Sequence, residues 1–243
     1  HMNRLDRSLG ELNMPSPMTR DDLLSAMMKL IAANDAKEGF LYLQITRGNG
    51  DRSYLYDDSY TPNIFAFTQG EKFKADSNPD PVALATVPDI RWARRDIKTT
   101  NLLGQVMAKQ AAHLAGAQEA LMIAPDGDIT EAGSSSFFFI KDRELFVRPV
   151  SNKILHGITR QTMLRVAEQF QLKIRETTYT LDEALRADEA FITAASIYVL
   201  PVGRIDDHII GDGTTGPITA ALRTAYLETA RAEFPVVPEV ETT

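Results

Sequence analysis

The sequence contains no cysteine in its 243 residues, which excludes disulfide bonds and zinc sites built from thiolates. It also has no apolar run near the roughly 20 residues that a membrane-spanning helix needs, and no signal-peptide pattern at its start. The glycine-rich phosphate loops of dinucleotide-binding and ATP-binding folds are missing as well. These absences predict a soluble, cytoplasmic protein with no metal site and no membrane partner.

Positive charge is in short supply, because 26 Lys and Arg residues face 33 Asp and Glu residues and the net charge is −7. A nucleic-acid partner would require a basic face for its phosphates, so none is expected. Hydrophobic residues make up 44% of the chain, which at this length allows a large core in one large or two modest domains.

The first third of the chain has the pattern of a small α/β domain. Thr19 and Asp22 predict the N-cap and first turn of a helix over residues 19–34, in which apolar residues recur at helical spacing. Runs rich in aromatic and branched side chains at 40–46 and 63–68 predict two strands. We expect the helix to cover the sheet that these strands form.

A polar stretch between Glu71 and Pro81 has the composition of a linker and predicts the domain boundary. It divides the chain into a small domain over residues 1–75 and a larger domain over residues 82–243. In the larger domain, strands are expected at 82–88, 119–124, 137–140, 145–149, 173–179 and 189–194, and helices at 159–170, 181–186 and 217–234. This mixed order predicts a two-domain α+β fold with a mixed, barrel-like sheet rather than a regular parallel one.

Lys98 lies in the stretch DIKTTNLL at residues 96–103, shortly after Trp92, the only tryptophan. The apolar residues around it indicate a junction that leads from a buried strand into a helix. Burial there would lower the pKa of the lysine toward that of a nucleophile able to form a Schiff base with an aldehyde cofactor. A solvated surface lysine is the alternative interpretation.

A candidate carboxylate, Glu131, follows in the stretch TEAGSSS at residues 130–136. A buried carboxylate beside the ring nitrogen of a pyridine cofactor keeps the ring protonated and able to accept electrons. The alternative is a polar residue that closes the turn at residues 125–127. The residue pair Lys98 and Glu131 is therefore more informative than either residue alone.

With these residues in place, the chain resembles the fold type IV pyridoxal phosphate aminotransferases, and most closely the D-amino acid aminotransferases. The resemblance runs from the first residue to about Thr224. The stretches that carry it are IRW at 90–92, DIKTTNLLG at 96–104, AKQ at 108–110, TE at 130–131, IL at 154–155, GITR at 157–160, ADE at 187–189 with Phe191, and PV at 201–202 ahead of ID at 205–206.

The resemblance implies a small α/β domain and a larger mixed pseudo-barrel domain that carries most of the cofactor site. It begins inside the family's pattern, since HMNRL at residues 1–5 matches an internal segment. The small domain is therefore expected to lack its first strands.

The resemblance also implies pyridoxal 5′-phosphate as the cofactor. Lys98 would hold it as an internal aldimine and move protons during the reaction, and Glu131 would contact the ring nitrogen. The other implied cofactor contacts are the amides of Ile158 and Thr159 at a helix start, the Thr159 hydroxyl, the Arg4 guanidinium, the Ala195 amide, Ser196 and, against the ring face, Leu155. Taken alone, Thr159 is equally explained as a helix N-cap, Arg4 as a surface arginine and Leu155 as a core residue.

Two places depart from the family's pattern. Ala194 and Ala195 stand where D-amino acid aminotransferases usually carry threonines that meet the phosphate, so one hydroxyl contact is expected to be lost. Those enzymes bind the substrate carboxylate with an Arg-x-His stretch, where this chain has Arg52 and Tyr54. Arg52 can still pair bidentately with a carboxylate, whereas Tyr54 offers a neutral phenol. An exposed hairpin arginine is the alternative for Arg52.

The function implied by resemblance is transamination of D-amino acids with a 2-keto acid acceptor, 2-oxoglutarate or pyruvate, by a ping-pong mechanism. R-selective amine transaminases and branched-chain L-aminotransferases share the scaffold and are alternatives. Two further alternatives are a 4-amino-4-deoxychorismate lyase, which uses the same lysine to release pyruvate, and a noncatalytic relative. A homodimer is also implied, in which loops of one subunit line the pocket of the other.

Overall fold

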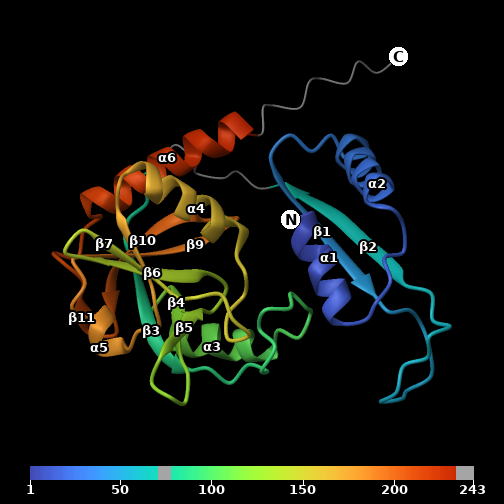
Figure 1. Cartoon of the computed structure of the whole chain (residues 1–243), viewed down its shortest axis with the longest axis horizontal. Helices are drawn as coiled ribbons and strands as arrows, with labels where there is room; N and C mark the ends of the chain where they lie inside the picture. The colour runs from blue at the N-terminus through green and yellow to red at the C-terminus, as the bar shows by residue number, and fades with distance from the viewer. Residues whose placement is uncertain (71–77, 234–243) are drawn as a thin grey trace. The chain divides into compact units, whose positions relative to one another are not determined.

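The structure is a computed structural model that describes residues 1–70 and 78–233. The described residues form two compact units, one within residues 1–70 and the other within residues 78–233 (Figure 1). The expected linker lies in part, at residues 71–77, outside the described residues. No helix in the two described ranges is long and apolar enough to cross a membrane.

The first unit contains two helices and a two-stranded antiparallel sheet. They are α1 (Met2–Glu11), α2 (Arg20–Ala33), β1 (Gly39–Thr46) and β2 (Asn63–Gly70). Helix α2 begins as predicted, because the Thr19 hydroxyl accepts a hydrogen bond from the Asp22 backbone nitrogen at 3.2 Å. It packs against β2, which confirms that it covers the small sheet.

Strands β1 and β2 pair without interruption, from Gly39 opposite Gly70 to Thr46 opposite Asn63. Gly39 has a φ of +150°, and a Cβ at this position would lie 2.1 Å from the carbonyl oxygen of Gln69. Only glycine therefore lets the two strands approach so closely at this end of the sheet. The strands are joined by a long loop over residues 47–62.

The second unit is built on a sheet of nine strands. They are β3 (Val82–Pro88), β4 (Glu119–Ile123), β5 (Ile129–Ala132), β6 (Ser136–Lys141), β7 (Glu144–Val147), β8 (Lys173–Glu176), β9 (Glu189–Ala194), β10 (Tyr198–Ile205) and β11 (His208–Ile209). Their order is β5-β4-β3-β10-β9-β6-β7-β8, with β11 paired to β10. The β3–β4, β3–β10 and β7–β8 pairs are parallel and the others antiparallel. The sheet is therefore mixed, as predicted.

Four helices accompany this sheet: α3 (Leu103–Leu114), α4 (Ile158–Gln169), α5 (Leu181–Ala184) and α6 (Pro217–Glu233). Helix α3 packs on β3 and β4, whereas α4 and α6 pack on each other and on β9, and α6 also contacts β10 (Figure 1). Fully buried side chains fill the space between helices and sheet, among them Met122 of β4 below α3, and Phe138 of β6 and Phe191 of β9, which pack in one cluster with Met163 of α4.

Most predicted elements of the second unit are present within a few residues, and the differences have physical causes. The strand expected at 173–179 ends at Glu176, because the chain leaves β7 after Thr177 donates to the carbonyl of Val147. The terminal helix ends at Glu233, and Phe234 lies outside the described residues. Strand β10 was not predicted, since Pro201 and Gly203 interrupt its sequence; Gly203 lies in the register shift between Val202 and Arg204.

Candidate functional site

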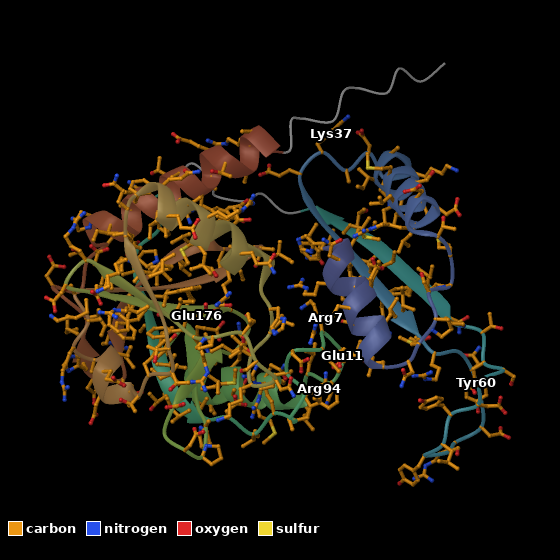
Figure 2. The ribbon with its side chains drawn as sticks, viewed as in Figure 1. Arg7, Glu11, Lys37, Tyr60, Arg94 and Glu176 are labelled. Atoms are coloured by element: carbon orange, nitrogen blue, oxygen red, sulfur yellow. The ribbon has the colours of Figure 1, made fainter. Side chains whose placement is uncertain are left out.

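The loop between β3 and α3, residues 89–102, carries the charged residues nearest to the predicted lysine. Asp96 lies two positions before Lys98 and its side chain is fully buried, with Arg94 donating to its two oxygens from Nε and Nη2 at 3.0 Å each. Arg94 is labelled in Figure 2. This bidentate pair fixes the backbone immediately before Lys98.

Lys98 itself differs from its prediction. It does lie between a strand and a helix, β3 and α3, but its side chain is exposed rather than buried. The reason is local: Ile97 points into the core while the next residue, in a segment without helix or strand, faces outward. Lys98 is therefore an accessible amine that follows the buried Asp96 by two residues.

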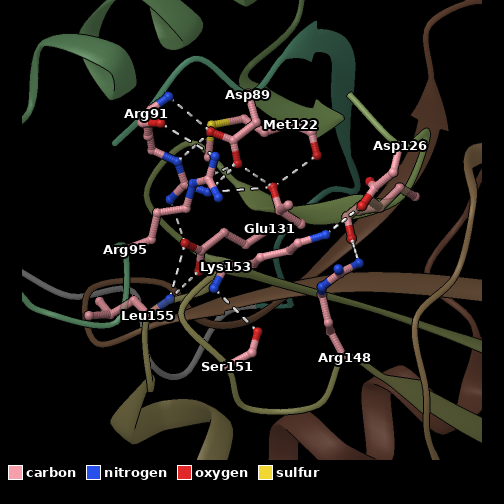
Figure 3. Close-up of polar contacts among 12 residues, drawn as sticks. Asp89, Arg91, Arg95, Met122, Asp126, Glu131, Arg148, Ser151, Lys153 and Leu155 are labelled. Atoms are coloured by element: carbon pink, nitrogen blue, oxygen red, sulfur yellow. Dashed lines mark hydrogen bonds and ion pairs between the residues drawn. The ribbon is translucent and has the colours of Figure 1, made fainter. Parts of the chain in front are cut away.

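Glu131 is the central carboxylate of the second unit and lies on β5, where every residue is buried. Its Oε1 accepts a hydrogen bond from Arg91 Nη1 at 2.5 Å, and both its oxygens lie 3.2 Å from the backbone nitrogen of Leu155 (Figure 3). The structure thus brings together Glu131 and Leu155, two of the predicted site residues. The alternative in which Glu131 only closes a turn is wrong, since it lies inside a strand.

Arg91 connects Glu131 to a second buried carboxylate, Asp89. Arg91 donates from Nε to Asp89 Oδ1 at 2.9 Å and from Nη2 to Asp89 Oδ2 at 2.7 Å. The Thr130 hydroxyl donates to Asp89 Oδ2 at 2.6 Å, and Arg95 Nε lies 3.3 Å from the same oxygen. Figure 3 shows this group of contacts. The side chains of Asp89, Arg91 and Glu131 are 0%, 5% and 7% exposed, so water screens these charges little.

Burial and charge act on the two carboxylates with different results. Burial raises the pKa of Glu131 above its ordinary value, although the Arg91 guanidinium opposes this. Burial also acts to raise the pKa of Asp89, but hydrogen bonds from Arg91 and Thr130 and the charge of Arg95 outweigh it, so that the pKa is lowered. Burial acts to lower the pKa of Arg91, yet its two carboxylate neighbours raise it, which keeps the guanidinium charged.

The predicted phosphate contacts lie at the start of α4. Gly157 is the N-cap, so Ile158 and Thr159 are the first two helical residues and the N-cap interpretation of Thr159 is wrong. Their backbone N–H groups belong to the first turn, where helical carbonyl partners are absent and anions bind favourably. The first turn of α4 holds no acidic residue that would compete with an anion.

The turn between β9 and β10 contains Ala195 and Ser196, both exposed. It follows Thr193, which pairs with Ser136 across β6, and the Ser136 hydroxyl lies 3.1 Å from the position that a Cβ on Gly157 would take. Ser136 therefore pairs with the end of strand β9 and lies close to the start of helix α4. The predicted phosphate contacts of the second unit are neighbours in the fold.

Three predicted residues belong to the first unit. Arg4 lies on α1, half-buried, and burial lowers its pKa. Arg52 and Tyr54 lie in the loop 47–62, where Arg52 Nη2 donates to the Tyr54 hydroxyl at 3.2 Å. Tyr54 and its neighbour Leu55 are 93% and 83% exposed, so the exposed-arginine alternative for this loop agrees with the structure.

Sequence reasoning gave no role to Asp89, Arg91 or Arg95. The signal available was the pair Asp89 and Arg91, two residues apart directly after a buried strand, because such spacing in an extended segment lets a carboxylate meet the guanidinium of the same segment. Chemically, the site combines a charge-balanced buried carboxylate, a helix N-terminus free of acidic residues and an accessible lysine. It suits a phosphorylated aromatic heterocycle with an aldehyde group.

Three comparisons with known proteins all find aminotransferases as similar proteins. The amino-transferase class IV family pattern matches residues 1–205. The D-alanine aminotransferase of Bacillus licheniformis is 38% identical over 233 residues, covering 96% of this chain and 82% of that protein. That of Staphylococcus haemolyticus is 35% identical over 227 residues, covering 93% and 80%.

Among solved structures, a branched-chain amino acid aminotransferase from Thermobaculum terrenum, in its pyridoxal phosphate form, has a TM-score of 0.85 and 26% identity, and covers 96% of this chain and 78% of that one. The branched-chain aminotransferase of Escherichia coli has a TM-score of 0.88 at 22% identity, covering 99% and 81%. These likenesses confirm the fold that the sequence predicted.

Proposed function

The chain belongs to the class IV aminotransferases, and we propose that it transfers the amino group of a D-amino acid to a 2-keto acid with pyridoxal 5′-phosphate as its cofactor. The likeness to two D-alanine aminotransferases, which extends over 96% and 93% of the chain, carries this proposal. 2-Oxoglutarate or pyruvate is the proposed acceptor. The solved branched-chain enzymes support the fold and supply the rival substrate class.

The residues of the second unit fit this cofactor. Glu131 Oε1 accepts from both Arg91 and Leu155, whereas Oε2 accepts, among the residues that the structure describes, only from the Leu155 nitrogen at 3.2 Å, and so retains room for a ring N–H donor. The amides of Ile158 and Thr159 and the Thr159 hydroxyl would hold the phosphate, with the Ala195 amide and Ser196 on the neighbouring turn. Leu155 would face the ring, and Arg4 of the first unit would add a positive charge.

When bound, pyridoxal phosphate supplies an aldehyde carbon that takes up the amino group and a protonated ring that withdraws electrons from the substrate Cα. Lys98 Nζ would hold the cofactor at its aldehyde carbon and, once displaced by the substrate amine, would move a proton between the substrate Cα and the cofactor C4′. Glu131 keeps the ring nitrogen protonated. Arg52 pairs with the substrate carboxylate, and the Tyr54 hydroxyl orients Arg52.

We also propose that the protein acts as a homodimer. Tyr54 and Leu55 are large apolar or aromatic side chains at the tip of a long loop, and they are 93% and 83% exposed in the single chain. Such exposure is typical of side chains that a partner covers. The loop of one subunit would then bring Arg52 to the substrate of the other.

The test is a half-reaction. The purified chain is loaded with pyridoxal phosphate, and D-alanine or L-alanine is added without any keto acid. We expect D-alanine alone to abolish the visible absorption of the lysine-bound cofactor and to release pyruvate. Loss of this absorption with L-alanine alone would instead identify the protein as a branched-chain L-aminotransferase. Pyruvate release from 4-amino-4-deoxychorismate without an acceptor would identify it as a lyase.

A matched control separates binding from chemistry. Borohydride reduction should fix the cofactor to the peptide that contains Lys98, as mass spectrometry can verify, and Lys98→Ala should remove this adduct. A wild-type chain that forms no adduct at any lysine would contradict the proposal for this chain, and the noncatalytic alternative would then hold.

A further inference from the structure

Arg91 lies between two buried carboxylates and donates more hydrogen bonds to Asp89 than to Glu131. It gives two donors, Nε and Nη2, to Asp89 at 2.9 and 2.7 Å, and its backbone nitrogen donates to Asp89 Oδ1 at 3.2 Å. Glu131 receives one donor, Nη1. The parallel two-bond geometry is the stronger and more directional of the two, so Asp89 and not Glu131 decides where the guanidinium lies.

The acceptor sites of the two carboxylates are filled to different degrees. Both oxygens of Asp89 have short contacts, since Oδ1 accepts from the Arg91 backbone and Nε, and Oδ2 accepts from Arg91 Nη2 and Thr130 and pairs with Arg95. Within residues 1–70 and 78–233, the one hydrogen bond to Glu131 Oε2 is the 3.2 Å contact from the Leu155 nitrogen. Asp89 therefore has no capacity left for a ligand, whereas Glu131 does.

The four charged side chains Asp89, Arg91, Arg95 and Glu131 also balance one another in charge. Asp89 and Glu131 contribute two negative charges, and Arg91 and Arg95 two positive charges. Without Asp89, the positive charge of Arg91, whose Nη1 lies 2.5 Å from Glu131 Oε1, would be balanced by Glu131 alone. A ligand cation beyond Glu131 would then meet a neutral ion pair instead of a negatively charged carboxylate. Asp89 cancels the charge of Arg91 from its other side.

We propose that Asp89 is a positioning residue that holds and neutralises Arg91, so that the negative charge of Glu131 stays available to a protonated ring nitrogen. Asp89 itself touches neither substrate nor cofactor in this role. The nature of the ligand rests on the proposed function, but the effect of Asp89 on Glu131 belongs to the protein alone and can be measured without cofactor.

The groups that face Glu131 define what such a measurement reports. Asp89 and Arg91, from the loop after β3, act on Glu131, and Arg95 of the same loop pairs with Asp89. Tyr179, which lies just before α5, also interacts electrostatically with Glu131. Burial raises the pKa of Tyr179, so its hydroxyl stays neutral over the range in which a carboxyl titrates. A change in Glu131 titration therefore reports on the loop charges.

The experiment follows the ¹³C resonance of the Glu131 carboxyl in the cofactor-free protein as pH is varied. Asp89→Asn removes one negative charge next to Arg91, so we expect the Glu131 pKa to fall by about one unit or more, a tenfold change in its proton affinity. Asp89→Glu keeps the charge and should stay closer to the wild type. An unchanged Glu131 titration in Asp89→Asn would overturn the proposal.

A charge-compensated variant separates charge from anchoring and guards against misfolding. Arg95→Gln removes a positive charge, so the double variant Asp89→Asn with Arg95→Gln restores the balance, and its Glu131 should titrate near the wild-type value. If Asp89→Asn alone does not fold, Arg95→Gln compared with the double variant measures the same effect of Asp89. A double variant that titrates like Asp89→Asn would contradict neutralisation as the cause.

A second readout uses the loaded protein. In ring-¹⁵N-labelled pyridoxal phosphate, the nitrogen shift should report a protonated ring in the wild type. In Asp89→Asn the ring pKa should be about one unit lower, a tenfold loss of proton affinity. Equal ring protonation in both would overturn the link to the ligand. A wild-type chain that binds no cofactor would instead refute the proposed function, while the Glu131 titration would still decide the role of Asp89.

Discussion

The backbone nitrogen of Leu155 lies 3.2 Å from both carboxylate oxygens of Glu131. This one donor connects β5, at one end of the sheet, to the segment that leads, two residues later, to the N-cap of α4. The carboxylate proposed for the ring nitrogen and the helix start proposed for the phosphate are therefore held at a fixed spacing by the protein itself.

Glu131→Gln should preserve the fold and impair catalysis. The amide cannot hold a proton on the ring nitrogen, and a hydrogen bond between charged groups contributes about 1.5–3 kcal/mol, so kcat should fall about 10- to 100-fold. Steady-state kinetics with D-alanine and 2-oxoglutarate measure this. The borohydride adduct at Lys98 should remain in this variant, and its loss would mean that Glu131 acts on binding instead.

Arg91→Met should destabilise the second unit strongly. It leaves Asp89 and Glu131 buried without their common cation, and breaking a buried ion pair on one side costs about 3–5 kcal/mol. Urea unfolding followed by the fluorescence of Trp92 measures the change. As a control, Lys141→Met breaks the exposed pair with Asp188, which water and salt screen, and the urea midpoint should change little.

The lowered pKa of Glu144 predicts how the stability of the fold depends on pH in acid. Its hydrogen bonds to Arg175 and Lys173 lower its pKa to about 2. Because the folded pKa lies below the unfolded value of 4.5, Glu144 stabilises the fold above pH 4.5, and this contribution is lost as pH falls toward 2.

Glu144→Gln should therefore unfold at lower urea than the wild type at neutral pH, and the two should converge near pH 2. The carboxylate is solvent-accessible, so added salt should narrow the difference. Glu168→Gln, an exposed carboxylate on α4, is the matched control. A difference that persists unchanged down to pH 2 would contradict the assignment.

Gly157→Ala should weaken cofactor binding more than it weakens the fold. The backbone of Gly157, with φ of −65°, accepts alanine, but the new Cβ would lie 3.1 Å from the Ser136 hydroxyl. Such crowding costs at most about 1–3 kcal/mol. Ser136→Ala in the same chain should relieve the crowding, so thermal melting and the dissociation constant of pyridoxal phosphate should both recover. A loss of affinity that the double variant leaves in place would point to a different cause.

Arg52→Met should raise KM for the D-amino acid about tenfold with a smaller change in kcat, since a charge-assisted pair with the substrate carboxylate contributes about 1.5–3 kcal/mol. The loop is exposed, so the melting temperature should change little. Tyr54→Phe removes only the hydroxyl that contacts Arg52, and its KM should rise less. Unchanged KM in Arg52→Met would remove Arg52 from the substrate site.

The predictable parts of the fold were those with a clear period or a clear cap. Helix α2 followed from Thr19, and strands β6 and β9 followed from runs of apolar residues that are buried on both faces. Strand β5 was missed because it has only four residues and two of them, Thr130 and Glu131, are polar. In the folded chain these two side chains are buried because they form hydrogen bonds with Asp89 and Arg91, which lie about 40 residues earlier. The sequence around β5 alone does not indicate these distant partners.

The candidate site shows the same limit. Lys98 and Glu131 were singled out from their local sequence and given their roles by resemblance, and the structure buries Glu131 but exposes Lys98. The contacts among Asp89, Arg91 and Arg95 depend on how a segment without helix or strand bends, and no periodic pattern predicts that. Side-chain types indicated which chemistry was available, while the charge balance required the coordinates.

Strand β8 lies at one end of the nine-stranded sheet, and no other strand of the described part of the chain pairs with its outer edge. Lys173 and Arg175 alternate along it and both reach back to Glu144 on β7, so two cations stand beside the free backbone groups. A second chain that added a strand here would have to strip water from these ions and would meet the same cations on an identical strand. This edge therefore protects the protein from aggregating through its own sheet, independently of any catalytic role.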